Sequence, residues 1–275
     1  MAEKIKVTYL GYCVELLQLL KNSVEFQVKN TVGVKGRMSE TQIAFIQENE
    51  IPYKEISEKN EIMDISGFLE KSDIAIIYKF EFIIPQVLVD QYTFFNFHGG
   101  NLRTNRGAHA VVWSILNREK STCLTLYKLT GGIDVGIVIG EYFVEIKNSD
   151  TPYTLNKKLR EGIPDLLILL KDYLQGKIEG KLISEGIYRR KIKEEDYTID
   201  CEKDSFADMR AKINSQAAYD GAVLWYKGKK YQVLSILYDG AADAARGKRS
   251  IKITGEKCMI EEQEKQIVLE ISAKS

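Results

Sequence analysis

The stretch SDIAIIYKFEFIIPQVLVDQYTFFNFH, from Ser72 to His98, decides the fold. Residues 72–78 are apolar enough for a strand that is buried on both faces, and residues 92–97 have the same character. Between them, the segment PQVLVDQY is typical of a short helix with Pro85 in its first turn, where the missing N–H costs little. Strand, helix and strand in this order predict a unit with two parallel strands.

The same alternation continues on the N-terminal side of this unit. Ser39 is suited to cap one of the helices there, with Gln42 three positions on as in a capping box. The pattern predicts an α/β fold, namely a Rossmann-like, mostly parallel sheet with helices on both faces. The expected strands are residues 5–10, 31–34 and 52–56, and the expected helices are residues 13–20, 39–50 and 61–70.

Beyond Gly107 the pattern predicts a helix, two strands joined by a glycine turn, and one long amphipathic helix over residues 151–175. The composition then changes, and strand-like runs such as GAVLWYKGKKYQVLSILY alternate with charged turns. One further helix is expected over residues 205–213. We therefore predict two domains, a larger one at residues 1–180 and a smaller, β-rich C-terminal one at residues 181–275.

The composition excludes several classes of function. The chain carries 39 basic and 39 acidic residues, so no net charge attracts nucleic acid. Its four cysteines are scattered without a C-x-x-C pair, which predicts reduced thiols and no bound metal. The first residues, MAEKIKVTYL, are too charged for a signal peptide, and no apolar run is long enough to span a bilayer. We expect a cytoplasmic protein with no nucleic-acid or membrane partner.

Both histidines of the chain, His98 and His109, fall within one short stretch. Asn96 and His98 end the second strand of the opening unit, and open α/β sheets bind ligands at the carboxyl ends of their strands. An Asn amide can donate to a developing oxyanion, and a neutral His can accept a proton from a nucleophile. From these two residues alone, a core histidine beside a turn asparagine is an equally good interpretation.

A second polar feature follows the next strand, in the sequence GGIDVG from Gly131 to Gly136. Its glycines allow a tight turn and the close approach of a ligand. An acid in such a turn, Asp134, is suited to orient a histidine as in a catalytic triad. A plain hairpin turn is the simpler interpretation of this segment taken alone.

Together the two features resemble the signature of the folate-dependent formyltransferases. That family includes glycinamide ribonucleotide transformylase, methionyl-tRNA formyltransferase and the nucleotide-sugar N-formyltransferases. Its signature is N-x-H in a short loop that ends in R-G, then a helix, a strand and D-x-G-x-D-x-G. The resemblance is clearest over residues 78–134 and extends more weakly to about Ala222. The matching residues are Asn96, His98, Arg106, Gly107, Trp113, Asn117, Gly132, Asp134 and Gly136.

The resemblance implies a reaction and a set of residues for it. A primary amine would attack the formyl carbon of 10-formyltetrahydrofolate, the formyl-donor cosubstrate, without a metal. Asn96 and His98 would act at the developing oxyanion or on the amine proton, and Asp134 would hold the imidazole. The larger domain would then be the catalytic one. In the family, two backbone segments cradle the pterin, and here they correspond to Ile83, Ile84, Pro85, Gly131, Gly132 and Ile133.

The chain departs from the family pattern in its loop. The family usually has H-P-S-L-L-P-x-Y-R-G, whereas this chain has HGGNLRTNRG from His98 to Gly107. The serine and both prolines are absent, which predicts a more flexible loop. Thr130 also replaces the leading acid of the second motif. These differences bear on the acceptor more than on the reaction, because Asn96, His98 and Asp134 are kept.

The residues around this loop indicate a phosphate-bearing acceptor. The side chains suited to a diphosphate are those of Lys79, Arg103, Arg106 and His109, although loop arginines are commonly only solvated. Tyr219 is suited to stack on a nucleotide base, with core packing as the plainer interpretation of such an aromatic.

These features favour a nucleotide-linked amino-dideoxy sugar, carried on dTDP or UDP, as the acceptor in bacterial surface-glycan biosynthesis. The loop sequence RGAH is also similar to that of bacterial sugar N-formyltransferases. The alternatives are an enzyme like methionyl-tRNA formyltransferase, and a non-catalytic module that binds folate or a nucleotide. By analogy with the family, we expect a homodimer.

Overall fold

The computed structural model describes residues 3–273, apart from the side chains of residues 243–247. The chain divides into two compact units, and each is built from separate stretches of sequence. The first unit contains the chain up to Gly107 together with Cys123–Phe143 and Leu159–Tyr188. The second unit contains Ala108–Thr122, Val144–Lys158 and the chain from Arg189 on.

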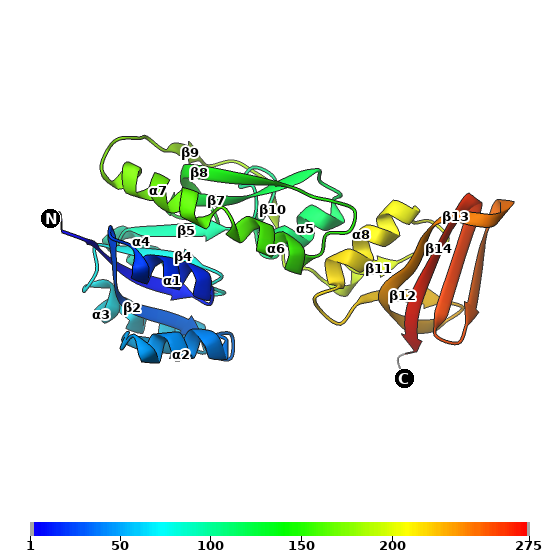
Figure 1. Cartoon of the computed structure of the whole chain (residues 1–275), viewed down its shortest axis with the longest axis horizontal. Coiled ribbons are helices and arrows are strands. Elements are labelled where there is room, and N and C mark those ends of the chain that lie inside the picture. The colour runs from blue at the N-terminus through cyan, green and yellow to red at the C-terminus, as the bar shows by residue number, and fades with distance from the viewer. Residues whose placement is uncertain (1–2, 274–275) are drawn as a thin grey trace. The chain divides into compact units, whose positions relative to one another are not determined.

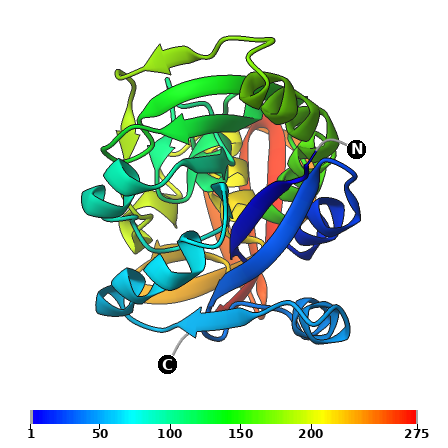
Figure 2. The ribbon, with the colours of Figure 1, turned by 90° about the vertical axis from the view of Figure 1, so that its left-hand side faces the viewer.

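The larger sheet contains eight strands in the order β3-β2-β1-β4-β5-β7-β8-β9 (Figures 1 and 2). Neighbouring strands from β3 to β5 are parallel, whereas β7 is antiparallel to β5 and β9 is antiparallel to β8. The prediction of a Rossmann-like, mostly parallel sheet is therefore confirmed. The strands are β1 (Ile5–Gly11), β2 (Phe26–Val34), β3 (Tyr53–Ile56), β4 (Ile74–Tyr78), β5 (Phe94–His98), β7 (Ser121–Leu129), β8 (Gly136–Glu145) and β9 (Lys181–Ile183).

The helix α2 follows its capping signal only in part: Ser39 is the cap residue, but Gln42 does not complete the capping box. Ser39 begins α2 by accepting a hydrogen bond from the backbone N–H of Gln42 at 3.2 Å. The Gln42 side chain turns away from the cap and donates to the carbonyl of Gly11 at 3.0 Å. The helices are α1 (Val14–Asn22), α2 (Glu40–Glu48), the 3-10 helix η1 (Lys59–Ile65), α3 (Ser66–Leu69), α4 (Gln86–Gln91), α5 (Ala110–Leu116), α6 (Pro152–Arg160), α7 (Ile163–Leu174), the 3-10 helix η2 (Glu194–Tyr197) and α8 (Phe206–Gln216).

The prediction of one long helix over residues 151–175 is wrong. The segment forms two helices, α6 and α7, separated by a short turn at Gly162. Pro164 lies in the first turn of α7, where a proline is tolerated. Within a continuous helix its ring would clash with the carbonyl four residues earlier, that of Arg160, which is the last residue of α6.

Other boundaries differ from the expected ones by a few residues. β2 begins at Phe26 rather than at residue 31, because the apolar pattern extends further toward the N-terminus than the β-branched run does. The helix expected over residues 61–70 is mostly the 3-10 helix η1, followed by a single α-helical turn. Pro85 is the cap residue before α4 rather than a member of its first turn.

The second unit contains a separate sheet in the order β11-β12-β13-β14, which confirms the β-rich C-terminal part (Figure 1). β13 and β14 are long antiparallel strands, and Ser205 is the cap residue before α8, where its side chain accepts from the N–H of Asp208. The apolar core of this unit includes Met209, Ile213 and Leu269. A domain boundary at residue 180 stays a prediction. The strands are β11 (Thr198–Ile199), β12 (Ala222–Tyr226), β13 (Lys229–Thr254) and β14 (Lys257–Ala273), and a further pair is β6 (Arg106–Gly107) with β10 (Tyr188–Arg189).

None of the helices within residues 3–273 is both long and apolar enough to cross a membrane.

The end of β1 allows a direct test of the packing of the parallel sheet. Gly11 has a φ of 141°, and a methyl group there would overlap the carbonyl oxygen of Tyr78 at the end of β4. We expect Gly11→Ala to lower the free energy of unfolding by roughly 2–4 kcal/mol, measured by urea denaturation. Gly67→Ala is the matched control, because Gly67 lies in α3 with open space around it, and it should be neutral or up to about 1 kcal/mol more stable. Equal stabilities for the two variants would contradict this account.

Candidate active site

β5 places Asn96 and His98 on one face of the sheet. Successive side chains of a strand point to opposite faces, so residues two apart lie on the same side. The strand is buried except at Asn96, which is half-buried, and the buried Phe97 lies between the two polar residues. His98 is the last residue of β5 and is 9% exposed. The site therefore begins at the carboxyl end of a central strand, where open α/β sheets bind ligands.

The neighbouring strand β7 contributes a residue that the sequence analysis missed. In the antiparallel register of β5 and β7, Tyr127 lies opposite Asn96. The Asn96 amide donates from Nδ2 to the Tyr127 hydroxyl at 3.0 Å, and this hydroxyl donates to Oδ1 of Asp134 at 2.7 Å. Burial, followed by the negative charge of Asp134, raises the pKa of Tyr127 well above its usual range. The phenol therefore keeps its proton and serves as a donor.

The glycine turn before β8 brings Asp134 to the same place. Gly131 and Gly132 have φ angles of 123° and 82°, which are accessible to glycine at little cost. The second carboxylate oxygen of Asp134, Oδ2, accepts the backbone N–H of Gly107 at 2.6 Å and lies 3.5 Å from Nδ1 of His98. The structure therefore brings Asn96, His98 and Asp134 together, as the resemblance implies.

The other nitrogen of the imidazole is held by the loop after β5. Nε2 of His98 lies 2.8 Å from the carbonyl oxygen of Asn105. Because a carbonyl oxygen only accepts, Nε2 carries the hydrogen in this contact. A neutral ring then presents the lone pair of Nδ1 to Asp134, whereas an imidazolium donates to both oxygens. This arrangement suits a histidine that stabilises negative charge while its ring stays fixed.

The loop of residues 99–105 closes on itself through Asn101 rather than through prolines. The backbone carbonyl of Asn101 accepts hydrogen bonds from the N–H groups of Thr104 and Asn105. The side-chain oxygen of Asn101 accepts one from the backbone N–H of Arg103. Leu102 is fully buried beneath the loop. The greater flexibility inferred from the missing prolines stays a prediction.

Arg103 and Arg106 both have partners within the first unit. The Arg103 guanidinium pairs with Glu141 at 2.9 Å. The Arg106 guanidinium donates to the carbonyls of Ser184 at 3.0 Å and Gly186 at 2.8 Å. The backbone N–H of Arg106 also donates to the carbonyl of Ile187. In this structure the two arginines fix the loop, and their contacts to a phosphate stay predictions.

Lys79 follows β4 directly, close to the end of β1. Its ammonium lies 5.8 Å from the centre of the Tyr78 ring. Burial lowers the pKa of Lys79, and the positive charge of Arg160 lowers it further. A negatively charged ligand would stabilise the protonated form of Lys79, because its charge offsets the loss of hydration and the repulsion from Arg160.

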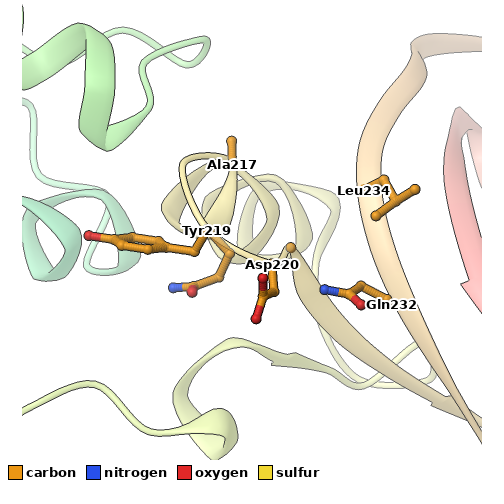
Figure 3. Close-up of a pocket in the computed structure, with 7 residues that line it drawn as sticks. Ala217, Tyr219, Asp220, Gln232 and Leu234 are labelled. Atoms are coloured by element: carbon orange, nitrogen blue, oxygen red, sulfur yellow. The ribbon is translucent and has the colours of Figure 1, made fainter. Parts of the chain in front are cut away.

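His109 and Tyr219 belong to the second unit. His109 begins α5, as expected, with a left-handed φ of 60°. Tyr219 lines a pocket of about 310 Å³ with Asp220 and Gln232, and the residue is 59% exposed, but its ring points away from Gln232 (Figure 3). Their roles toward phosphate and base stay predictions.

The two segments expected to cradle a pterin lie side by side. Ile83 is exposed, Ile84 is buried, and Pro85 leads into α4. A methyl group on Gly131 would lie 2.7 Å from Oε1 of Gln86, the first residue of α4, so the turn packs directly against that helix. The Gln86 amide occupies the space beside Gly131, so a larger residue there would require that side chain to move. The contacts of both segments to a pterin stay predictions.

Among the side chains that the structure describes, no three histidine, cysteine, aspartate or glutamate residues are placed to hold a metal ion.

The chain belongs to the formyl transferase family, whose model matches residues 21–169. It is 31% identical over 176 residues to a methionyl-tRNA formyltransferase from Prochlorococcus marinus subsp. pastoris, over 60% of this chain and 53% of that protein. The chain spans about half the length of the curated relatives it matches.

Solved structures share the fold as well. WlaRD, a sugar 3N-formyltransferase solved with dTDP and 5-N-formyl-tetrahydrofolate, superposes with a TM-score of 0.70 at 17% identity, over 100% of both chains. A 4-N formyltransferase from Francisella tularensis superposes with a TM-score of 0.66 at 21% identity, over 82% of this chain and 95% of that one. The family expected from the Asn-x-His and Gly-x-Asp-x-Gly residues is therefore confirmed.

The convergence of donors on Asp134 predicts the effect of a neutral replacement. In Asp134→Asn the amide supplies one acceptor oxygen, and its Nδ2 hydrogens face either the Gly107 N–H or the Tyr127 hydroxyl. We expect the free energy of unfolding to fall by about 1–3 kcal/mol in urea denaturation. Asp165→Asn, at an exposed position in the first turn of α7, makes the same charge change and should cost less than about 1 kcal/mol. A loss no greater than that of this control would refute the hydrogen-bond account.

Proposed function

We propose that this protein transfers a formyl group from 10-formyltetrahydrofolate to the primary amine of a nucleotide-linked amino-dideoxy sugar. The observation that carries the proposal is the convergence of Asn96, His98 and Asp134 at the end of β5, in a chain of the formyl transferase family. The proposed setting is the cytoplasmic synthesis of a bacterial surface glycan on a dTDP or UDP carrier.

In the proposed reaction the folate supplies the formyl group, and the residues of the site handle charge and protons. Asn96 donates from its amide to the formyl oxygen, on which negative charge develops. His98, held between the carbonyl of Asn105 and the carboxylate of Asp134, places the positive charge of its imidazolium near the developing oxyanion. Asp134 fixes the ring and offsets its charge. As the new N–C bond forms, the proton of the attacking amine passes to solvent. The bond between the formyl carbon and N10 of the folate then breaks, and N10 takes up a proton as tetrahydrofolate leaves.

Two backbone segments would hold the pterin of the donor. Residues 83–85 before α4 and residues 131–133 in the turn are the proposed contacts, and the packing of Gly131 against Gln86, the first residue of α4, supports a site that both segments share. The exposed aliphatic side chains of Ile83 and Ile133 offer apolar surface on both segments.

The proposed acceptor is supported by charge and by the extent of the fold. A net charge of zero does not favour binding to a nucleic acid. The likeness to WlaRD covers the whole of both chains, including the C-terminal sheet, so the fold of a sugar 3N-formyltransferase accounts for the whole of this chain. Lys79 is the proposed contact for the diphosphate, supported by its lowered pKa. Arg103, Arg106 and His109 remain further candidates, and Tyr219 the candidate for stacking on the base.

A second candidate acceptor is charged initiator tRNA. The observation in its favour is that several relatives similar in sequence carry the name methionyl-tRNA formyltransferase. A panel of amino-sugar nucleotides and charged initiator tRNA, each incubated with the protein and 10-formyltetrahydrofolate, separates the two candidates. We expect mass spectrometry to show one added formyl group on an amino-sugar nucleotide. Formylation of the tRNA alone would overturn the proposed acceptor.

His98→Asn separates an enzyme from a module that only binds. We expect the variant to bind the folate with a dissociation constant within about threefold of wild type and to lose formyl transfer by roughly 10²-fold or more. Calorimetric titration and single-turnover assays measure the two properties. A wild-type protein that binds 10-formyltetrahydrofolate and transfers to no acceptor would establish the binding module instead.

We also propose a homodimer in solution, by analogy with the family. Multi-angle light scattering should give twice the chain mass of 31.4 kDa at micromolar concentration. A mass of one chain that does not change with concentration would remove this part of the proposal.

A further inference from the structure

The hydroxyl of Tyr127 lies in a hydrogen-bond chain whose direction is fixed. The Asp134 carboxylate only accepts, so the single proton of the Tyr127 hydroxyl points to Oδ1 at 2.7 Å. The remaining lone pairs of that hydroxyl can only accept. The Asn96 atom 3.0 Å away must therefore be the amide nitrogen, and not the amide oxygen.

This direction decides which atoms Asn96 offers to a ligand. An Asn amide has two N–H donors and one carbonyl acceptor, and either end of the group fits a similar space. With one N–H used by Tyr127, the second N–H and the carbonyl have defined positions. Reversing the amide would place its carbonyl oxygen against the lone pairs of the hydroxyl, which is unfavourable. A donor aimed in advance costs no reorganisation when charge develops on a substrate.

The position of Tyr127 makes this contact rigid. Tyr127 is 1% exposed, and it faces Asn96 as a cross-strand pair in the middle of two hydrogen-bonded strands. Its raised pKa keeps the phenol protonated, so the direction of the chain does not change near neutral pH. The backbone N–H of Gly107 donates to the other oxygen of Asp134, and so it holds the end of the hydrogen-bond chain that is furthest from Asn96.

We propose that Tyr127 is a positioning residue for formyl transfer: its hydroxyl sets the orientation of the Asn96 amide and passes the constraint to Asp134. The inference rests on the proposed function and deepens it. Tyr127 itself touches no reacting atom in this account, and it acts through Asn96.

The kinetic test replaces the hydroxyl alone. Tyr127→Phe should lower kcat roughly 10- to 100-fold, less than the roughly 10²- to 10³-fold typical of deleting an oxyanion donor, with KM for both substrates within about threefold. Tyr173→Phe is the matched control and should keep wild-type kcat. Tyr173 lies in α7, and its ring packs on that of Phe95 in β5. Thermal melts of both variants show that each is folded at the assay temperature.

A double-mutant cycle distinguishes positioning from a structural effect. If Tyr127 acts through Asn96, then adding Tyr127→Phe to Asn96→Ala should lower kcat by less than about twofold further. A structural role would lower the rate by the same factor in both backgrounds. Equal factors would overturn the inference.

A second readout needs no substrate. In ¹⁵N–¹H spectra of the side-chain amides, assigned with Asn96→Ala, one hydrogen of Asn96 should exchange slowly with water in the wild type and rapidly in Tyr127→Phe. The inference is overturned, and the proposed function is not, if the Asn96 hydrogen exchanges at the same rate in both proteins. The same holds if Tyr127→Phe and Tyr173→Phe have equal kcat in an active enzyme. A wild type that formylates no acceptor overturns the proposed function, and the inference falls with it.

Discussion

The Asp134 carboxylate binds donors from separate segments of the first unit, and the arrangement of the site depends on it. Its oxygens accept hydrogen bonds from the hydroxyl of Tyr127 in β7 and from the N–H of Gly107 in β6, and they face the ring of His98 at the end of β5. A carboxylate that is mostly removed from water is costly unless donors surround it. Charge-assisted hydrogen bonds are also stronger than neutral ones. The contacts of this one carboxylate therefore hold the glycine turn and the ends of the neighbouring segments in fixed positions relative to one another.

The polar residues of the site differ in how far the sequence could predict them. Asn96 and His98 share a face because they are two apart on a strand, which the local pattern shows. Asp134 was found through its glycine turn, although only the joint match with Asn96 and His98 gave it a function. Tyr127 was missed because its role depends on the register between β5 and β7, and an alternating aromatic in a strand is ordinary core. No local signal carries that register, since the paired residues are 31 apart.

The same distinction explains the parts of the fold that were predicted wrongly. The break between α6 and α7 was present in the sequence as Gly162 and Pro164, but the apolar spacing continued across it and concealed it. The partners of Arg106 could not be predicted, because they are backbone carbonyls almost 80 residues further along the chain. An arginine in a loop can serve a ligand or the protein's own backbone, and composition alone does not separate these uses.

The anchoring of Arg106 also sets an order of events during synthesis. All three polar residues of the proposed catalytic group have been translated once Asp134 is made, and the parallel strands that support them precede it. The loop over His98 is bound to residues 184–187, so it gains its last partners only when the chain has grown to β10. A nascent chain that ends between Asp134 and Ser184 contains the parallel strands and Asp134. It lacks the carbonyl groups that bind Arg106. Domains fold as units as they emerge, and in this unit the loop over His98 is among the last parts to gain its contacts.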